Sequence, residues 1–213
     1  MYIFISLILT EMLTLTAMAY DRYVAICHPL HYFIFMSLRH TVIFAVASWT
    51  IAFLNLTGYA VLISELSFCK SHLIDHFFCD AIPLLMISCS DTFKIEILTY
   101  VEGTILDIPA FLLTFISYIF IISSILKIQS SEGRKKAFST CTSHLTCVSL
   151  FYGTSIPLYM RPTSSLSPKN KYFSLLYVVL VPMLNPVIYT LKNQDIKEAL
   201  KKTVNKMVFL RPH

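Results

Sequence analysis

The sequence has little charge and little glycine for its length. Of its 213 residues, 14% are Asp, Glu, Lys or Arg and 56% are hydrophobic, a balance that excludes an ordinary soluble domain. A helix that crosses a hydrocarbon core of about 30 Å needs about 20 largely apolar residues, so several such helices fit in this chain. The composition therefore indicates a polytopic membrane protein.

Other absences narrow the function classes. The chain contains only four glycines, and they form no Gly-rich phosphate loop. Histidines and carboxylates are dispersed, so no catalytic constellation emerges, and we expect neither an enzyme nor a cofactor. The net charge of +5 comes from basic residues in short loops instead of one continuous stripe, which argues against nucleic acid as a partner.

Five apolar spans are predicted within a single transmembrane domain that covers residues 1–205. They cover residues of about 1–27, 41–63, 95–128, 137–159 and 173–191. The longest loop between spans is 64–94. The basic residues orient the spans, because 12 of the 17 Lys and Arg residues fall on the same side as Arg22. By the positive-inside rule, we expect the N-terminus outside the cell and the C-terminus in the cytoplasm.

After the last span, the spacing of the apolar residues changes over residues 192–205. Ile196, Ala199 and Leu200 fall on one helical face, while lysines face away, so we predict a basic amphipathic helix on the inner leaflet. A solvated tail with accidental periodicity is the alternative. Residues 206–213 are predicted to be a cytoplasmic tail.

Three evenly spaced cysteines lie in the longest loop: Cys69, Cys79 and Cys89. Their spacing suits an extracytosolic loop that is closed by disulfides. Cys69, His72, His76 and Cys79 also resemble a zinc site in ligand type and spacing. We favour the disulfide because this side of the membrane is oxidising, and we expect no metal; His76 and Cys79 would remain as weak candidate ligands.

Four motifs follow one another along the chain. They are MAYDRYVAICHPLHY at Met18–Tyr32, IDHFFCD at Ile74–Asp80, KAFSTCTSHL at Lys136–Leu145 and PMLNPVIYTLKN at Pro182–Asn193. Together they resemble the olfactory (odorant) receptors of the rhodopsin-like G-protein-coupled receptor family. The resemblance implies an all-α membrane protein: a partial seven-helix bundle made of family helices 3 to 7, with a short amphipathic C-terminal helix. Because Asp21 follows only 20 residues of chain, we expect an N-terminally truncated receptor that lacks the first two helices.

The resemblance also assigns residues to G-protein coupling and activation. These are Asp21, Arg22, Tyr23, Tyr118, Asn185, Pro186 and Tyr189. In the family the aspartate holds the arginine at rest, and the arginine then contacts the G protein. The tyrosine of the NPxxY element turns inward toward a fifth-helix tyrosine. A proline kink with a buried tyrosine is the alternative for that element.

A ligand pocket is assigned by the same resemblance. Its expected lining is Phe4, Ile5, Ile8, Leu9, Glu102, Gly103, Leu106, Tyr152, Ser155, Ile156 and Tyr159. Ordinary helix packing is the alternative for each of these residues. An apolar pocket with few polar groups suits a small volatile molecule.

Two further expectations come from family positions. The outer loop cysteines pair in the family, which implies a Cys69–Cys89 disulfide and leaves Cys79 as an odd thiol. Glu11 occupies a position that helps to hold a sodium ion together with an aspartate on the second helix. That second helix has no counterpart in this sequence.

The resemblance therefore implies an odorant receptor in the plasma membrane that binds small volatile ligands and activates a stimulatory, olfactory-type G protein. Association with other receptors as oligomers is a further expectation. One alternative is a non-signalling remnant, a pseudogene product or isoform that is retained in the endoplasmic reticulum or associates with other receptors. A multi-pass transporter or scaffold is the third hypothesis for the function. It is disfavoured, because a transporter should show repeated spans with polar breaks at the midplane.

Overall fold

Most of the chain is helical in the computed structural model. The structure describes residues 1–69, 73–74, 76–78, 81–159, 170–192, 199 and 202–203. The chain divides into two compact units. The first contains Met1–Ile128, and the second contains most of the described residues from Gln129 onward.

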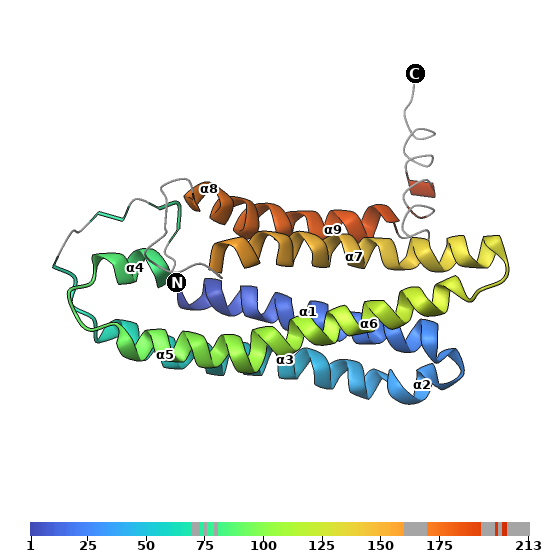
Figure 1. Cartoon of the computed structure of the whole chain (residues 1–213), viewed down its shortest axis with the longest axis horizontal. Coiled ribbons are helices and arrows are strands. Elements are labelled where there is room, and N and C mark those ends of the chain that lie inside the picture. Colours follow the sequence, from blue (N-terminus) through green and yellow to red (C-terminus); the bar gives the residue numbers. More distant parts are fainter. Residues whose placement is uncertain are drawn as a thin grey trace, which may run out of the picture. The chain divides into compact units, whose positions relative to one another are not determined.

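Three long helical segments build the first unit. α1 covers Tyr2–Cys27, α3 covers Leu38–Ser64, and a continuous helical run covers Phe93–Leu126 (Figure 1). They occupy the parts of the chain where the sequence predicts the first three spans. α1 packs against α3 and also against α6 (Ile108–Leu126), which is the second half of the long run. α1 is therefore the central helix of this unit.

The contact between α1 and α6 follows the helical period. α6 buries residues three or four positions apart, which form one face of an α-helix. They are Ala110, Thr114, Tyr118, Ile121 and Ile125. Polar groups add to this face, since Thr114 Oγ1 donates to Thr16 Oγ1 at 3.4 Å.

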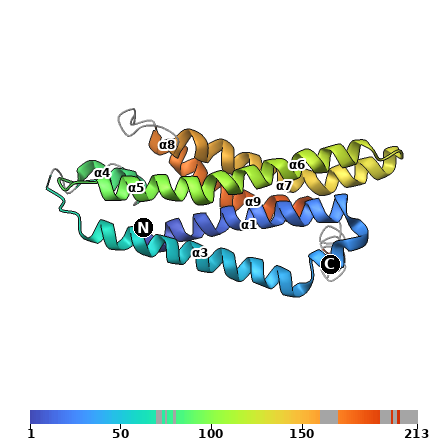
Figure 2. The same ribbon diagram turned by 60° about the horizontal axis from the view of Figure 1, so that its bottom comes forward.

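α1 and α3 run side by side (Figure 2). Ala52, Leu56 and Tyr59 of α3 are buried and again lie three or four positions apart. The Tyr2 hydroxyl donates to the Phe53 carbonyl at 2.9 Å and so ties the start of α1 to α3.

A short connection joins the two helices. α1 ends before Pro29, which lacks the backbone N–H that would continue the helix. A single 3₁₀ turn, η1 (Pro29–His31), and the short helix α2 (Tyr32–Phe35) follow. This connection brings Tyr32 back toward the end of α1.

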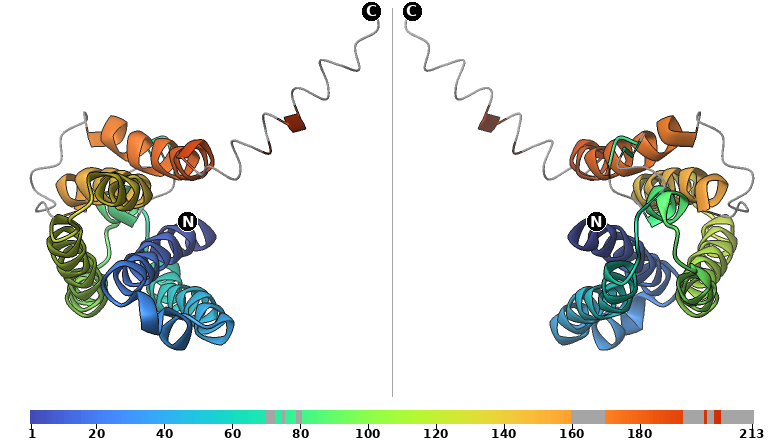
Figure 3. Two further views of the ribbon diagram at one scale, coloured as in Figure 1. Left: turned by 90° about the vertical axis from the view of Figure 1, so that its right-hand side faces the viewer. Right: turned by 90° about the vertical axis from the view of Figure 1, so that its left-hand side faces the viewer.

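The second unit contains two antiparallel helical runs. Its elements after Gln129, in chain order, are α7 (Ser131–Tyr159), α8 (Asn170–Leu175), η4 (Leu176–Leu180) and α9 (Val181–Lys192). α7 packs against η4 and α9, as the end-on views in Figure 3 show. The rings of Phe151 and Tyr177, with centroids 5.4 Å apart, lie in this contact.

Two short π-helical stretches interrupt the helical runs. They are η2 (Gly103–Asp107), inside the long run of the first unit, and η4 in the second. Each is followed by a proline at the second position of the next α-helix, Pro109 in one case and Pro182 in the other. Proline has no N–H to donate, and its ring clashes with the carbonyl four residues earlier. In both places the turn before the proline is widened, which the apolar pattern does not predict.

The long loop contains structure that the sequence did not predict. A short helix, α4 (Ala81–Ile87), lies within residues 64–94, and Phe68 and Ser88 form an isolated antiparallel bridge. Apart from that bridge, the regular structure of the described residues is helical. The predicted amphipathic helix at 192–205 and the tail at 206–213 lie outside the described residues, except for Lys192, Ala199, Lys202 and Thr203.

Three helices of the described part are long and apolar enough to cross a membrane. They are Tyr2–Cys27, Leu38–Ser64 and Phe93–Leu126. A shorter apolar helix covers Tyr177–Ile188. The predicted fold class, an all-α membrane bundle, is confirmed.

Candidate functional site

The end of α1 carries a charged pair. Arg22 Nε lies 3.6 Å from Asp21 Oδ2, and 36% of the Arg22 side chain and 21% of the Asp21 side chain are exposed. Both charges therefore lie at the surface of the helix end, where water can reach them. This is the pair to which the family resemblance assigns a role in activation.

Tyr32 is a third member of this site. Its hydroxyl donates to Asp21 Oδ1 at 2.9 Å, so the two carboxylate oxygens of Asp21 have different partners. The hydrogen bond to Asp21 raises the pKa of Tyr32 above its usual range, and burial adds to this shift, while Arg22 opposes it. Tyr32 therefore stays protonated and holds the carboxylate in place.

No sequence pattern singles out Tyr32 for this role. It lies 11 residues after Asp21 and in a different helix. Only the turn at Pro29 brings the two side chains together. Tyr32 does lie at the end of the motif string that starts at Met18, which is the one signal that could have drawn attention to it.

Tyr23 lies beside the charged pair and faces a groove. Its hydroxyl is 3.1 Å from His28 Nε2, and its ring contacts those of Tyr20 and Phe120. The groove has a volume of about 360 Å³ and is lined by Tyr20, Tyr23, Val24, His28, His31 and Phe35.

The other predicted activation residues lie in both units. Tyr118 is buried in α6, with 5% of its surface exposed. Asn185 is half-buried in α9, and Pro186 is an exposed residue inside the same helix. Tyr189 belongs to α9, but its side chain lies outside the described part. The predicted approach of Tyr189 to Tyr118 stays a prediction.

Four predicted pocket residues lie on α1. Leu9 is buried, while Phe4, Ile5 and Ile8 are half-buried. The ring of Phe4 contacts that of Phe78 in the long loop, with centroids 5.2 Å apart. Phe78 was not among the predicted pocket residues, and only the fold brings it next to Phe4.

Three further pocket candidates lie on the long helical run of the first unit. Glu102 ends α5 (Phe93–Glu102), and Gly103 and Leu106 belong to η2. Asn55 Nδ2 of α3 donates to Glu102 Oε1 at 2.7 Å, so the carboxyl group of Glu102 is directed to a neighbouring helix.

The remaining pocket candidates belong to α7 in the second unit. Tyr152 is buried against Phe151, Ser155 is half-buried and Ile156 is exposed. The side chain of Tyr159 lies outside the described residues. The assignment of all these side chains to one pocket stays a prediction.

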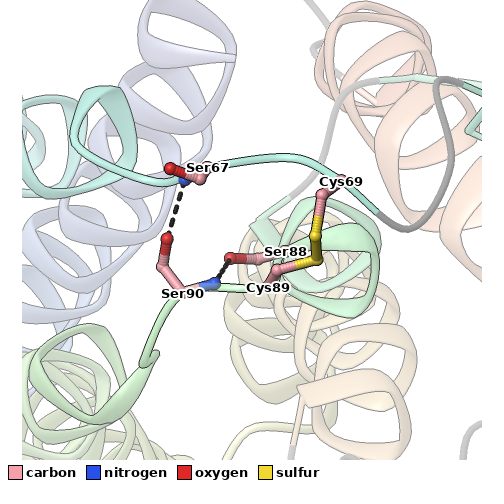
Figure 4. Close-up of a disulfide and its surroundings, with 5 residues drawn as sticks. All are labelled: Ser67, Cys69, Ser88, Cys89 and Ser90. Atoms are coloured by element: carbon pink, nitrogen blue, oxygen red, sulfur yellow. Dashed lines mark hydrogen bonds between the residues drawn. A yellow bond between two sulfur atoms is a disulfide. The ribbon is translucent and has the colours of Figure 1, made fainter.

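A disulfide closes the long loop. Cys69 and Cys89 are bonded, with their Cα atoms 5.9 Å apart (Figure 4). Ser67 N donates to Ser90 Oγ at 2.8 Å and Ser90 N donates to Ser88 Oγ at 3.2 Å, so hydrogen bonds join the chain around the bridge. The pairing that the resemblance implied is present.

The zinc alternative loses a ligand to this disulfide. A bridged cysteine has no thiolate to offer, and among the described residues no group of three His, Cys, Asp or Glu side chains is placed to hold a metal. His72 and Cys79 lie outside the described part. His76 Nδ1 lies 3.0 Å from the Phe78 carbonyl.

Glu11, the predicted ion ligand, is half-buried on α1.

Comparison with known proteins identifies the family. A sequence profile described as olfactory receptor matches residues 1–207. The chain belongs to the olfactory receptor family. It is 47% identical to olfactory receptor 5AR1 of Mus musculus and to olfactory receptor 5AR1 of Homo sapiens, in each case over 95% of this chain. It is also 46% identical to olfactory receptor 5B12 of Homo sapiens over 96% of this chain.

The family identification that rests on the four motifs is therefore confirmed. Family membership also confirms the prediction that the chain is not an enzyme. The chain spans 66% of the length of each of these three relatives.

Proposed function

We propose that the chain acts as an odorant receptor, which binds a small volatile molecule and activates a stimulatory G protein so that cyclic AMP rises. The observation that supports this best is the Asp21–Arg22 pair, held by Tyr32 at the end of α1. It occurs in a chain of the olfactory receptor family. Ionisable residues in a membrane-spanning helix are functional-site candidates by default, and here the two charges pair with each other at the helix end.

The geometry suits a release mechanism. An ion pair as exposed as Asp21–Arg22 is worth about 1 kcal/mol or less. A G protein that offers Arg22 new contacts can therefore displace Asp21 at small cost. Tyr32 remains bonded to Asp21 and keeps the carboxylate from following the arginine.

The ligand side is proposed to be apolar. Phe4, Ile5, Ile8 and Leu9 offer aromatic and aliphatic surface on α1, and Phe78 adds a ring from the long loop. Such surface favours a small apolar ligand over a charged one.

The proposed location is the plasma membrane, with the disulfide loop outside the cell and Arg22 in the cytoplasm. The Cys69–Cys89 disulfide supports this orientation, because disulfides persist on the oxidising side of the membrane. The distribution of basic residues supports it independently.

A cyclic AMP assay tests the proposal. Cells that express the chain are exposed to a panel of volatile compounds, with surface expression measured in parallel. We expect at least one compound to raise cyclic AMP, and Arg22→Ala to abolish the response at equal surface expression. Arg39→Ala is the matched control, because Arg39 is an exposed arginine with no assigned role, and its response should equal that of the wild type.

A chain that reaches the surface and gives no Arg22-dependent signal would contradict the proposal. That result would support the non-signalling alternative instead. A response that survives Arg22→Ala would show that the charged pair is not the coupling site.

A further inference from the structure

Two hydrogen bonds join α3 to α5 inside the predicted membrane. Asn55 Nδ2 donates to Glu102 Oε1 at 2.7 Å, and the Tyr59 hydroxyl donates to Thr99 Oγ1 at 3.0 Å. Tyr59 follows Asn55 by one helical turn, and Thr99 precedes Glu102 by about one turn. Because α3 and α5 run antiparallel, the two hydrogen bonds lie one after the other along the contact between these helices. We call this line of contact the seam.

The seam lies deep in both helices. Asn55 precedes the end of α3 at Ser64 by nine residues, and Glu102 follows the start of α5 at Phe93 by nine. At about 1.5 Å per residue, each side chain lies about 14 Å from its helix end. That depth approaches half of a hydrocarbon core of about 30 Å. A carboxyl or amide group at such a depth needs a protein partner, because lipid offers none.

The two helices are also in contact at this seam. Gly58 lies between Asn55 and Tyr59, and a Cβ atom added there would be 3.7 Å from Leu98 Cδ2, an ordinary van der Waals distance. Tyr59 is 5% exposed. Small residues at a helix contact let polar side chains such as Asn55 reach across it.

Glu102 links this contact between helices to residues that are predicted to line the ligand pocket. Glu102 is the last residue before the π-helical segment Gly103–Asp107. A π turn changes the rotation of every residue that follows it. Whatever fixes Glu102 therefore fixes where the π-helical segment begins, and with it the direction of Ile105 and Leu106.

We propose that Asn55 and Glu102, supported by Tyr59 and Thr99, form an interhelical clamp that holds α5 against α3 and positions the π-helical segment Gly103–Asp107. Glu102 is then a positioning residue and not a ligand contact. The effect on ligand response rests on the proposed receptor function, whereas the position of the segment does not.

The first test measures the position of the π-helical segment without any ligand. The full chain in lipid nanodiscs carries Ile105→Cys or Leu106→Cys, and mass spectrometry follows labelling of that cysteine by a membrane-permeant maleimide. Ile105 is 64% exposed and Leu106 is half-buried, so position 105 should be labelled faster. Adding Asn55→Leu should reduce or reverse this difference.

Two further variants separate positioning from simple loss of stability. Glu102→Gln keeps an acceptor oxygen for Asn55, and we expect it to preserve the labelling difference. The exchanged pair Asn55→Glu with Glu102→Asn should restore the difference that Asn55→Leu removes. Glu96→Leu is the matched control, because Glu96 is an exposed carboxylate on the same helix. An unchanged labelling difference in Asn55→Leu would overturn the proposal.

The second test uses the odorant response at equal surface expression. Loss of one hydrogen bond of this kind should raise the half-maximal odorant concentration about tenfold in Asn55→Leu and in Glu102→Leu, and the double variant should be no worse than either. Glu102→Gln should stay within about twofold of the wild type. If Glu102 contacts the ligand directly, Asn55→Leu will leave the response unchanged and Glu102→Gln will alter it, which overturns the clamp.

The two proposals fail in different ways. A wild-type chain that responds to no odorant contradicts the receptor function, while the labelling experiment still decides whether the clamp exists. A normal odorant response with no labelling change contradicts only the clamp.

Discussion

Asp21 has two partners, and they act on it in different ways. Arg22 offers a charge at 3.6 Å, and Tyr32 offers a directed hydrogen bond at 2.9 Å. The exposed ion pair contributes little, whereas a hydrogen bond to a charged group is shorter and more directional. The position of the carboxylate is therefore set more by Tyr32 than by Arg22.

Tyr32→Phe should reduce stability in a pH-dependent way. The pKa of Tyr32 is raised in the folded chain, so its contribution is complete below about pH 10, the usual value for tyrosine, and is lost as pH rises through the raised pKa. We expect Tyr32→Phe to lower the free energy of unfolding by about 1 kcal/mol at neutral pH, and the difference from wild type to shrink in strongly alkaline solution. Thermal unfolding in nanodiscs across that pH range measures both effects.

Tyr100→Phe serves as the control for this experiment. Its side chain is 78% exposed, so removing its hydroxyl should change stability little at any pH. A constant difference between wild type and Tyr32→Phe up to high pH would show that the Asp21 hydrogen bond is not responsible.

At the scale of the element, the fold of the loop between α3 and α5 depends on the Cys69–Cys89 disulfide. Cys69 and Cys89 are 20 residues apart, and closing a loop of this length stabilises a fold by about 3 kcal/mol in the chain-entropy view. The bridge also holds the chain that carries Phe78 against Phe4.

Cys89→Ser should therefore lower both thermal stability and surface expression. Cys27→Ser is the matched control, because Cys27 forms no disulfide and lies at the other end of the first unit's helices. We expect the control to keep surface expression near that of wild type, as measured by flow cytometry of an epitope-tagged chain. Equal expression of the two variants would contradict a stabilising role for the bridge.

The long helices were predictable from sequence, because long apolar runs bounded by Pro29 or by charged loops are typical of membrane-spanning helices. The π-helical segments were not. Pro109 and Pro182 mark where a helix is disturbed, but the sequence does not say whether the helix bends, breaks or widens. Packing against neighbouring helices decides that outcome.

The site was predictable only where a motif names it. Asp21 and Arg22 are neighbours in the chain, so their contact follows from sequence. The contacts of Tyr32 with Asp21 and of Asn55 with Glu102 join separate helices, 11 and 47 residues apart. No periodic pattern encodes such pairs, because they depend on how the helices pack.

At the scale of the whole molecule, the distribution of charge predicts the topology. The side of the membrane that holds Arg22 carries 12 of the 17 basic residues, which the positive-inside rule assigns to the cytoplasm. This predicted topology puts the disulfide loop outside the cell, on the oxidising side where disulfides persist.

Epitope tags on the two termini test this topology. On intact cells, we expect antibody to bind a tag placed before Met1, and to bind a tag placed after His213 only once the cells are permeabilised. A tagged cytosolic protein reports whether the cells are intact. Binding to the C-terminal tag on intact cells would contradict the proposed orientation.

The π turn before Pro109 also has a mechanical meaning. Sharp bends in helices occur at prolines and at π turns, and Gly103–Asp107 with Pro109 combines both. Beyond this segment, the 19 residues of α6 form a rod of about 28 Å. A tilt of about 10° at Gly103–Asp107 would move the far end of the rod, near Leu126, by about 5 Å. By this geometry, a small change of angle at the level of the proposed clamp would correspond to a larger displacement at the opposite end of α6.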